Sequence, residues 1–240
     1  MAKKGKLKEF QEKELEERPI RYKRYKYLFL IVCEDENTEP TYFQDFKNQI
    51  PEETIFLKPV GTGRDAKGVV EQAIVEKEKL SIEAKREVDV VWAVFDKDDA
   101  DENATKIKRF EDAFEIAKDN KIKTAYSNEV FELWLLLHLT EVDANVALPR
   151  AKIYTLLQEN IRGYEGHKKF EYKHGNVSIL QIIYKVGCQE DAISRAEKLF
   201  QLQVSKTPIE ANPNTMVHIL VTELLELVTY FSYEPAKSKS

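Results

Sequence analysis

An uninterrupted apolar run that ends in acidic residues is the feature of this sequence that most restricts its fold. Residues 28–33 read LFLIVC, and Glu34, Asp35 and Glu36 follow at once. The run shows no alternation of apolar and polar residues, so both of its faces must be buried, which is typical of a central strand in a parallel sheet. Carboxylates at its end would lie where open α/β sheets bind their ligands. The segment therefore predicts a site at that edge of the sheet.

Strand and helix patterns alternate through the first half of the chain. Short apolar runs predict strands at residues 55–60, 88–95 and 121–126. A first helix is opened by Glu39 and Pro40, and apolar residues spaced by three and four predict further helices over residues 69–87 and 107–117. This order is typical of an α/β protein, so we expect a parallel sheet flanked by helices.

From about residue 148 the pattern changes. No convincing strand is apparent there, and helices are predicted at residues 150–161, 177–186, 189–202 and 213–231. We therefore expect four regions along the chain, which are a basic N-terminal extension (1–26), an α/β domain (27–147), a mainly helical region (148–232) and a disordered tail (233–240). In the extension, tyrosines alternate with lysines and arginines, a pattern suited either to phosphate contact with base stacking or to a solvated lead-in.

Composition excludes several classes of protein. A chain of 240 residues with 42% apolar content can bury a sizeable core. The net charge of -5 argues against binding nucleic acid through bulk charge, although a local basic patch is compatible with it. Two cysteines, no signal peptide pattern and no apolar run long enough to cross a bilayer predict a reduced, cytoplasmic protein that does not enter membranes.

A second acidic cluster follows the strand predicted at residues 88–95. Asp96, Asp98 and Asp99 lie at its end, as Glu34 lies at the end of the first strand. Parallel strands end at the same edge of a sheet, so these carboxylates could meet, and their mutual repulsion would raise their pKa values. A divalent cation relieves that repulsion, and oxygen ligands without His or Cys favour Mg²⁺ or Mn²⁺. The alternative is that the acids only solvate turns or cap helices.

These residues resemble a known family. Glu34 and the Asp96-Lys97-Asp98 triplet look like the signature of the Toprim domain, a Glu followed by an Asp-x-Asp pair at the ends of neighbouring parallel strands. More closely, the chain from about residue 27 to 228 resembles the RloB family of prokaryotic defence proteins, in the segments LIVCEDENTEPTYF, VWAVFDKDD, SNEVFELWLLLH and NPNTMVHILV. The resemblance implies a Toprim-like nuclease that uses a divalent metal, and the sequence leaves open whether it acts on DNA, RNA or tRNA. It also implies abortive phage defence beside an ATPase partner.

The resemblance also assigns roles to residues. Glu34 would be the general acid or base or a metal ligand, Asp96 and Asp98 would be metal ligands, and Asp99 would lie further out. The position after the Toprim Glu is commonly glycine, which lets the backbone approach a ligand closely. Here it is Asp35, whose side chain could narrow the site or add a ligand.

The segment SNEVFELWLLLHL, residues 127–139, contributes two more candidates. It predicts a helix that begins near Glu129, so Glu132 lies in the first turn or so, where the helix dipole favours a carboxylate. The family pattern makes Glu132 an active-site candidate and His138 a further one. A histidine among leucines is more often part of the core. The two residues are six apart, about 120° around a helix, so they do not share a face.

Two further segments carry candidate phosphate contacts. GTGRDAKG, residues 61–68, lacks the Walker pattern and is read as a turn from which Arg64 or Lys67 could contact phosphate. KKFEYKHG, residues 168–175, is basic with two aromatics, so it could touch nucleic acid or the catalytic edge, with Lys173 as a candidate contact.

Three functional classes stay open on the sequence. The first is a metal-dependent nuclease. The second is a regulatory or toxin-like subunit that acts only in complex with an ATPase, and the third is a non-catalytic nucleic-acid-binding or interaction module. The two acidic clusters favour the first class, whereas Asp35 in place of the usual glycine keeps the third one open.

Overall fold

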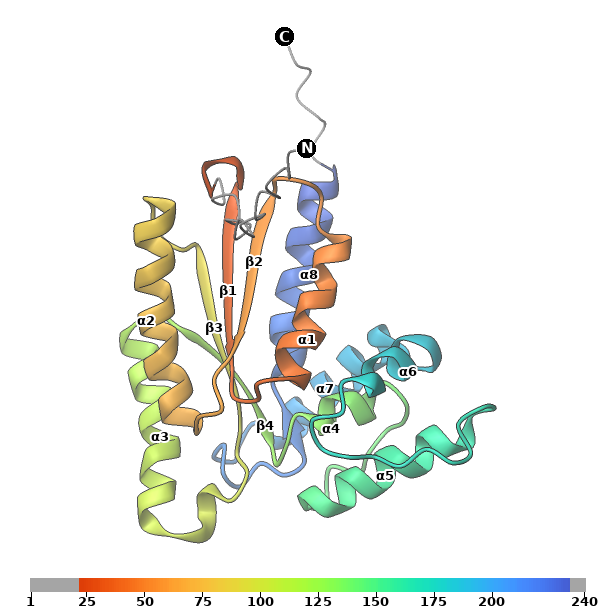
Figure 1. The fold of residues 1–240 in the computed structure, drawn as a ribbon. Coiled ribbons are helices and arrows are strands. Elements are labelled where there is room, and N and C mark those ends of the chain that lie inside the picture. The colour runs from red at the N-terminus through yellow and green to blue at the C-terminus, as the bar shows by residue number, and fades with distance from the viewer. Residues whose placement is uncertain (1–21, 234–240) are drawn as a thin grey trace, which may run out of the picture.

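The computed structural model describes residues 22–233, which form a mixed α/β fold around one five-stranded sheet (Figure 1). Four strands run parallel and a short fifth one is antiparallel. The strands are β1 (Tyr27–Cys33), β2 (Ile55–Gly61), β3 (Val90–Asp96), β4 (Lys123–Asn128) and β5 (Asn214–Thr215). Their order across the sheet is β2-β1-β3-β4-β5. The predicted parallel sheet flanked by helices is confirmed.

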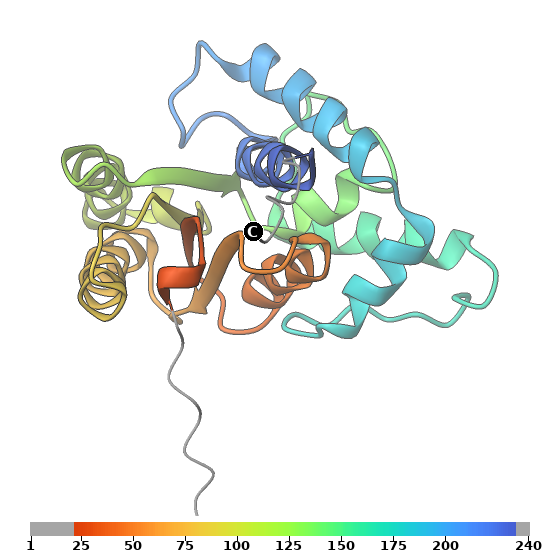
Figure 2. The same cartoon turned by 90° about the horizontal axis from the view of Figure 1, so that it is seen from above.

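The described residues also form eight α-helices. They are α1 (Thr38–Asp45), α2 (Ala66–Ala84), α3 (Ala104–Asp119), α4 (Glu132–Leu137), α5 (Arg150–Gly163), α6 (Ser178–Val186), α7 (Gln189–Gln203) and α8 (Val217–Tyr233). Helices α2 and α3 cover one face of the sheet, and α1 and α8 cover the other (Figure 1). The view from above places α5, α6 and α7 on the side of α1 and α8, away from α2 and α3 (Figure 2).

The central strand β1 is buried on both faces, as its sequence predicts. Leu28, Leu30 and Val32 belong to the core cluster that includes α2 and α3. The intervening residues of the strand face the other core cluster, which includes α1 and the C-terminal helices. Every residue from 28 to 33 has 0% of its surface exposed. The apolar run lacks alternation because each face of the strand has its own hydrophobic core.

The C-terminal region returns to the sheet, which the sequence did not predict. Strand β5 pairs with the end of β4, and the hydroxyl groups of Ser127 and Thr215 lie 2.9 Å apart. A strand of two residues has no periodicity to reveal it. Because β5 occupies residues 214–215, α8 begins at Val217 rather than at residue 213. One core cluster contains both Trp134 and Leu224, so residues on both sides of position 148 share it.

Most of the predicted N-terminal extension, residues 1–21, lies outside the described residues, as do residues 234–240 of the predicted tail. Within the described part, Tyr22 and Tyr25 pack edge-on against Phe56 of β2, with ring centroids 5.0 and 5.2 Å apart. These two rings therefore add to the core at the sheet edge. Between residues 22 and 233, no helix combines the length and the apolar character that crossing a bilayer requires.

Candidate active site

The candidate site lies where the chain changes direction across the sheet. After β1 the chain turns to α1 on one face, whereas after β3 it turns to α3 on the other (Figure 1). Strands β1 and β3 are neighbours, with Cys33 opposite Val94. Two loops that leave neighbouring strands toward opposite faces open a crevice between them, and open α/β sheets bind ligands there.

The two acidic clusters meet in this crevice, as the sequence predicts. The backbone N–H of Asp96 donates a hydrogen bond to Glu34 Oε2 at 3.0 Å. The N–H of Glu34 in turn donates to the carbonyl of Val94 at 2.9 Å, which extends the β1–β3 pairing by one residue. The Glu34 carboxylate is therefore held across the end of β3 by main-chain geometry.

A cleft of about 600 Å³ opens onto these acids. Glu34, Asp96 and Asp98 line it, and Arg64 and Arg150 line it as well. Tyr154 on α5 and His174 on the segment before α6 line the cleft too. The volume falls in the range of ordinary ligand pockets.

The carboxylates in the cleft are hard to ionise. Burial raises the pKa of Glu34 to about 8, although the hydrogen bond from the Asp96 N–H acts to lower it. Burial also raises the pKa values of Asp96 and Glu39, and the neighbouring carboxylates add to both shifts. Like charges held out of water disfavour one another's ionised forms. The site therefore carries more acidic groups than its protein surroundings balance.

Among residues 22–233, two buried carboxylate oxygen atoms have no hydrogen-bond partner. They are Asp96 Oδ1 and Glu39 Oε1. Glu39 is 1% exposed, and its other oxygen accepts a hydrogen bond from the N–H of Asp35 at 3.2 Å. From the sequence, Glu39 was expected only to open the first helix. The overlooked signal is that α1 follows the acidic loop directly, which places Glu39 near enough to Glu34 and Asp35 for their charges to add to burial in raising its pKa.

These groups suit a hard divalent cation by their chemistry. Unpaired buried carboxylate oxygens with raised pKa values gain from a nearby positive charge, and oxygen ligands are those that Mg²⁺ and Mn²⁺ prefer. Among residues 22–233, however, no group of three or more His, Cys, Asp or Glu side chains is already arranged to hold a metal ion. Asp98 instead accepts a hydrogen bond from Arg150 Nη2 at 2.5 Å.

Glu132 is linked to the site through its contacts with Tyr172 and His174. It is the first residue of α4 and is 3% exposed, and α4 begins there rather than near Glu129 as predicted. Its carboxylate accepts a hydrogen bond from the Tyr172 hydroxyl and lies 3.4 Å from His174 Nδ1. Both partners belong to the segment 168–175, so the structure brings this basic and aromatic segment to the acidic edge.

The remaining acidic candidates face the helix starts. Asp35 lines the cleft, and its Oδ2 accepts a hydrogen bond from the N–H of Thr38, the first residue of α1, at 2.5 Å. Asp99 is exposed and pairs with Lys106, and this hydrogen bond lowers the pKa of Asp99. Both side chains therefore serve at least the local roles that acids take at turns and helix N-termini.

The basic candidates and His138 lie in different surroundings. Arg64 is exposed and lines the cleft, whereas Lys67 forms an ion pair with Asp112 at 2.8 Å. Lys173 is exposed on the segment before α6. His138 is 5% exposed among core aromatics, its Nδ1 lies 2.9 Å from the Trp134 carbonyl, and burial lowers its pKa to about 4. The structure thus places His138 in the core rather than in the cleft.

Gly61 at the end of β2 allows the acidic loop to pass close by. A Cβ at this position would lie 2.6 Å from Glu36 Cα and 2.7 Å from the Asp35 carbonyl oxygen. Both are backbone atoms, so the loop would have to move. We expect Gly61→Ala to lower the free energy of unfolding by about 1–3 kcal/mol, the usual cost of overpacking, as measured by urea denaturation.

Gly163→Ala is the matched control for this change, because a Cβ at Gly163 meets no atom within 4 Å. Equal unfolding midpoints for the two variants would contradict the close packing assigned to Gly61.

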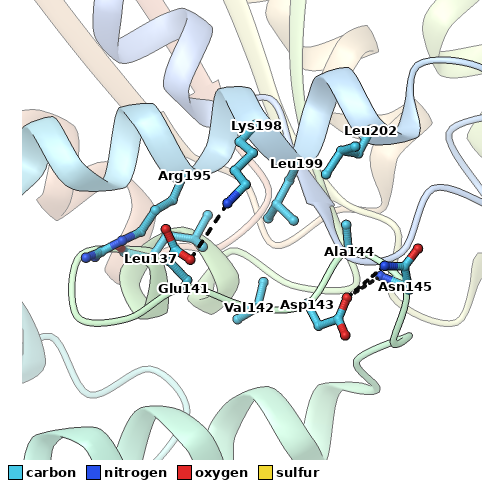
Figure 3. Close-up of a pocket in the computed structure, with 10 residues that line it drawn as sticks. All are labelled: Leu137, Glu141, Val142, Asp143, Ala144, Asn145, Arg195, Lys198, Leu199 and Leu202. Carbon is cyan, nitrogen blue, oxygen red and sulfur yellow. Dashed lines mark hydrogen bonds and ion pairs between the residues drawn. The ribbon is translucent and has the colours of Figure 1, made fainter.

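A second cavity, of about 420 Å³, lies between residues 141–145 and α7 (Figure 3). Each of its charged residues already has a partner within the protein. Lys198 lies 3.8 Å from Glu141, and Asp143 accepts a hydrogen bond from the N–H of Asn145 at 2.9 Å. Apolar side chains of α7, Leu199 among them, form its wall. This cavity lacks the unpaired buried carboxylates of the crevice, so the crevice is the better candidate site.

Comparison with known proteins gives one match. The model of the family described as RloB-like protein matches residues 29–224, which covers most of the chain. Neither the curated proteins nor the solved structures that were searched contain a match.

Proposed function

Because this chain belongs to the RloB-like protein family, we propose that it is a metal-dependent, Toprim-type nuclease that hydrolyses phosphodiester bonds in defence against phage. Membership of the family fits a defence-related role. The observation that carries the nuclease proposal is the meeting of Glu34 and Asp96 at the switch point of the sheet, where Asp96 Oδ1 is buried without a partner. This is the Glu and Asp-x-Asp arrangement that resembles the Toprim signature.

In this proposal each part of the cleft has a chemical task. Asp96 and Asp98 would hold Mg²⁺ or Mn²⁺, which when bound supplies positive charge for the phosphate and an activated water. Glu34 would be either a third ligand or the general acid or base. Without a metal its pKa is about 8, so in the second role it could take or release a proton near neutral pH. Arg64 and Arg150 line the cleft, and in this proposal their guanidinium groups would bind phosphate oxygens.

A second candidate function is a subunit that is inactive until an ATPase partner binds. The specific observation in its favour is the Arg150–Asp98 ion pair, since Asp98 is engaged by a cation of the protein itself. In that case the partner would have to release Asp98 for metal binding. The ATPase partner itself is proposed on family membership alone.

The nuclease proposal is tested with purified protein and three substrates, which are plasmid DNA, single-stranded DNA and total tRNA. Each is incubated with Mn²⁺ or with EDTA. We expect cleavage that requires the metal and falls by at least about 100-fold in Glu34→Gln, because the variant loses a charge at the metal and a proton carrier. Glu115→Gln, an exposed site on α3, serves as the matched control and should cleave like the wild type.

Cleavage that persists in EDTA, or that Glu34→Gln retains in full, would refute the proposal. If the wild type is inert, a candidate ATPase partner is added and the assay repeated. Activity that appears only then supports the dependent subunit.

A further inference from the structure

We propose that the substrate of this site is an unpaired nucleic-acid strand, one base of which stacks on the rings of Tyr154 and His174 at the rim of the cleft. The inference rests on the proposed function and names its substrate class. It comes from the aromatic groups that share the cleft with the acids.

Three rings from two segments lie together beside the acidic crevice. Tyr154 of α5 lies 4.9 Å from Tyr172 between ring centroids. Its centroid lies 6.3 Å from that of His174, with 31° between the two planes, and its hydroxyl lies 3.4 Å from His174 Nδ1. Tyr154 and His174 line the same cleft as Glu34 and Asp96. The His174 side chain is 65% exposed, so its ring is accessible to a ligand.

The three rings differ in what they contact. The Tyr172 hydroxyl donates a hydrogen bond to Glu132, so this ring is held against a buried carboxylate. Tyr154 and His174 line the cleft, as Arg150 does. Cations that follow a phosphate backbone, combined with aromatic rings on which bases stack, are the usual equipment of proteins that bind single strands.

The burial of the acidic side chains favours an unpaired nucleic-acid strand over a duplex. Asp96 Oδ1 is shielded from solvent, and Glu39 and Glu132 are buried. A scissile phosphate must therefore enter a cleft of about 600 Å³, which fits a nucleotide rather than the broad surface of a duplex. In a duplex the bases are stacked on each other and paired, so no base face is free to meet a side chain. In a single strand or a loop, a base can turn out and stack.

The test measures binding in an Asp96→Asn background, so that it does not depend on cleavage. Fluorescent 12-nucleotide single-stranded DNA, the matching RNA and the DNA duplex are titrated with protein and followed by anisotropy. We expect single strands to bind at least about tenfold more tightly than the duplex. Tyr154→Leu should weaken single-strand binding by about 5-fold to 150-fold, the range expected for loss of one stacked base. Duplex binding should stay unchanged.

Further variants separate stacking from a folding defect. Tyr154→Phe keeps the ring and should bind like its parent, whereas His174→Leu should weaken single-strand binding from a side chain that is mostly exposed. Tyr230→Leu, an exposed ring on α8, is the matched control and should leave binding unchanged.

Equal affinity for duplex and single strand, or single-strand binding that neither Tyr154→Leu nor His174→Leu weakens, would overturn the inference. Its failure differs from a failure of the proposed function. Preferential single-strand binding through Tyr154, without any metal-dependent cleavage by the wild type alone or with the candidate ATPase partner, would leave the inference standing and refute the nuclease. Cleavage of intact duplex as fast as single strands would do the reverse.

Discussion

Replacing Asp96 with asparagine is expected to abolish cleavage and, in metal-free buffer, to stabilise the folded protein. The Asp96 carboxylate is buried, and Glu39 and Glu34 add to the burial in raising its pKa. Its ionisation therefore costs free energy when no cation is present. Asparagine has nearly the same shape and no charge, so this cost disappears. The same change removes a proposed metal ligand, and a metal ion supplies several kcal/mol of transition-state stabilisation.

Two measurements on one variant check this prediction. Cleavage of the preferred substrate with Mn²⁺ should fall by at least about 1,000-fold, since each factor of ten in rate corresponds to about 1.4 kcal/mol. The melting temperature in EDTA at pH 8 should rise above that of the wild type. Asp119→Asn, at the exposed end of α3, is the control and should leave cleavage unchanged. An Asp96→Asn protein that melts lower in EDTA would show that this carboxylate stabilises the fold, which would contradict the assigned role.

The sequence predicts most of what positions the site. The run at residues 28–33 predicts a strand buried on both faces, and the structure shows that its two faces contact separate core clusters. A parallel sheet places the ends of its strands at one edge, and the hydrogen bond between Asp96 N–H and Glu34 confirms that the two acidic clusters meet there. These predictions succeed because the patterns are local and long.

Two contacts between distant chain segments were not predicted. Arg150 pairs with Asp98 across 52 positions, and Tyr172 contacts Glu132 across 40. No periodicity or spacing relates such residues, because only the packing of α4 and α5 against the crevice brings them together. Strand β5 was not predicted for another reason, which is that two residues are too few to form a pattern.

A proton and a metal ion can each neutralise the buried carboxylates at the ends of β1 and β3. Metal binding should therefore depend on pH. The pKa of Glu34 rises from an ordinary 4.5 to about 8 on folding, with burial as the main cause. Between pH 4.5 and about pH 8, Glu34 is protonated more often in the folded protein than in the unfolded chain. The free energy of unfolding is therefore highest, as far as Glu34 contributes to it, below pH 4.5. This contribution is lost as the pH rises through about 8, because Glu34 then has to ionise in a buried position.

A bound divalent cation would replace the proton, so its stabilising effect should grow with pH over the same range. We expect Mn²⁺ to raise the melting temperature of the wild type much more at pH 8 than at pH 5, with a difference on the order of a few kcal/mol in unfolding free energy. Thermal melts at pH 5, 6, 7 and 8, with EDTA or Mn²⁺, measure this directly. Comparison with Glu34→Gln removes the contributions of other titrating groups, and that variant should show a smaller, flatter response to the metal. A stabilisation by Mn²⁺ that is equal at every pH would mean that the ion binds away from the buried acids, since only groups that release protons can couple metal binding to pH.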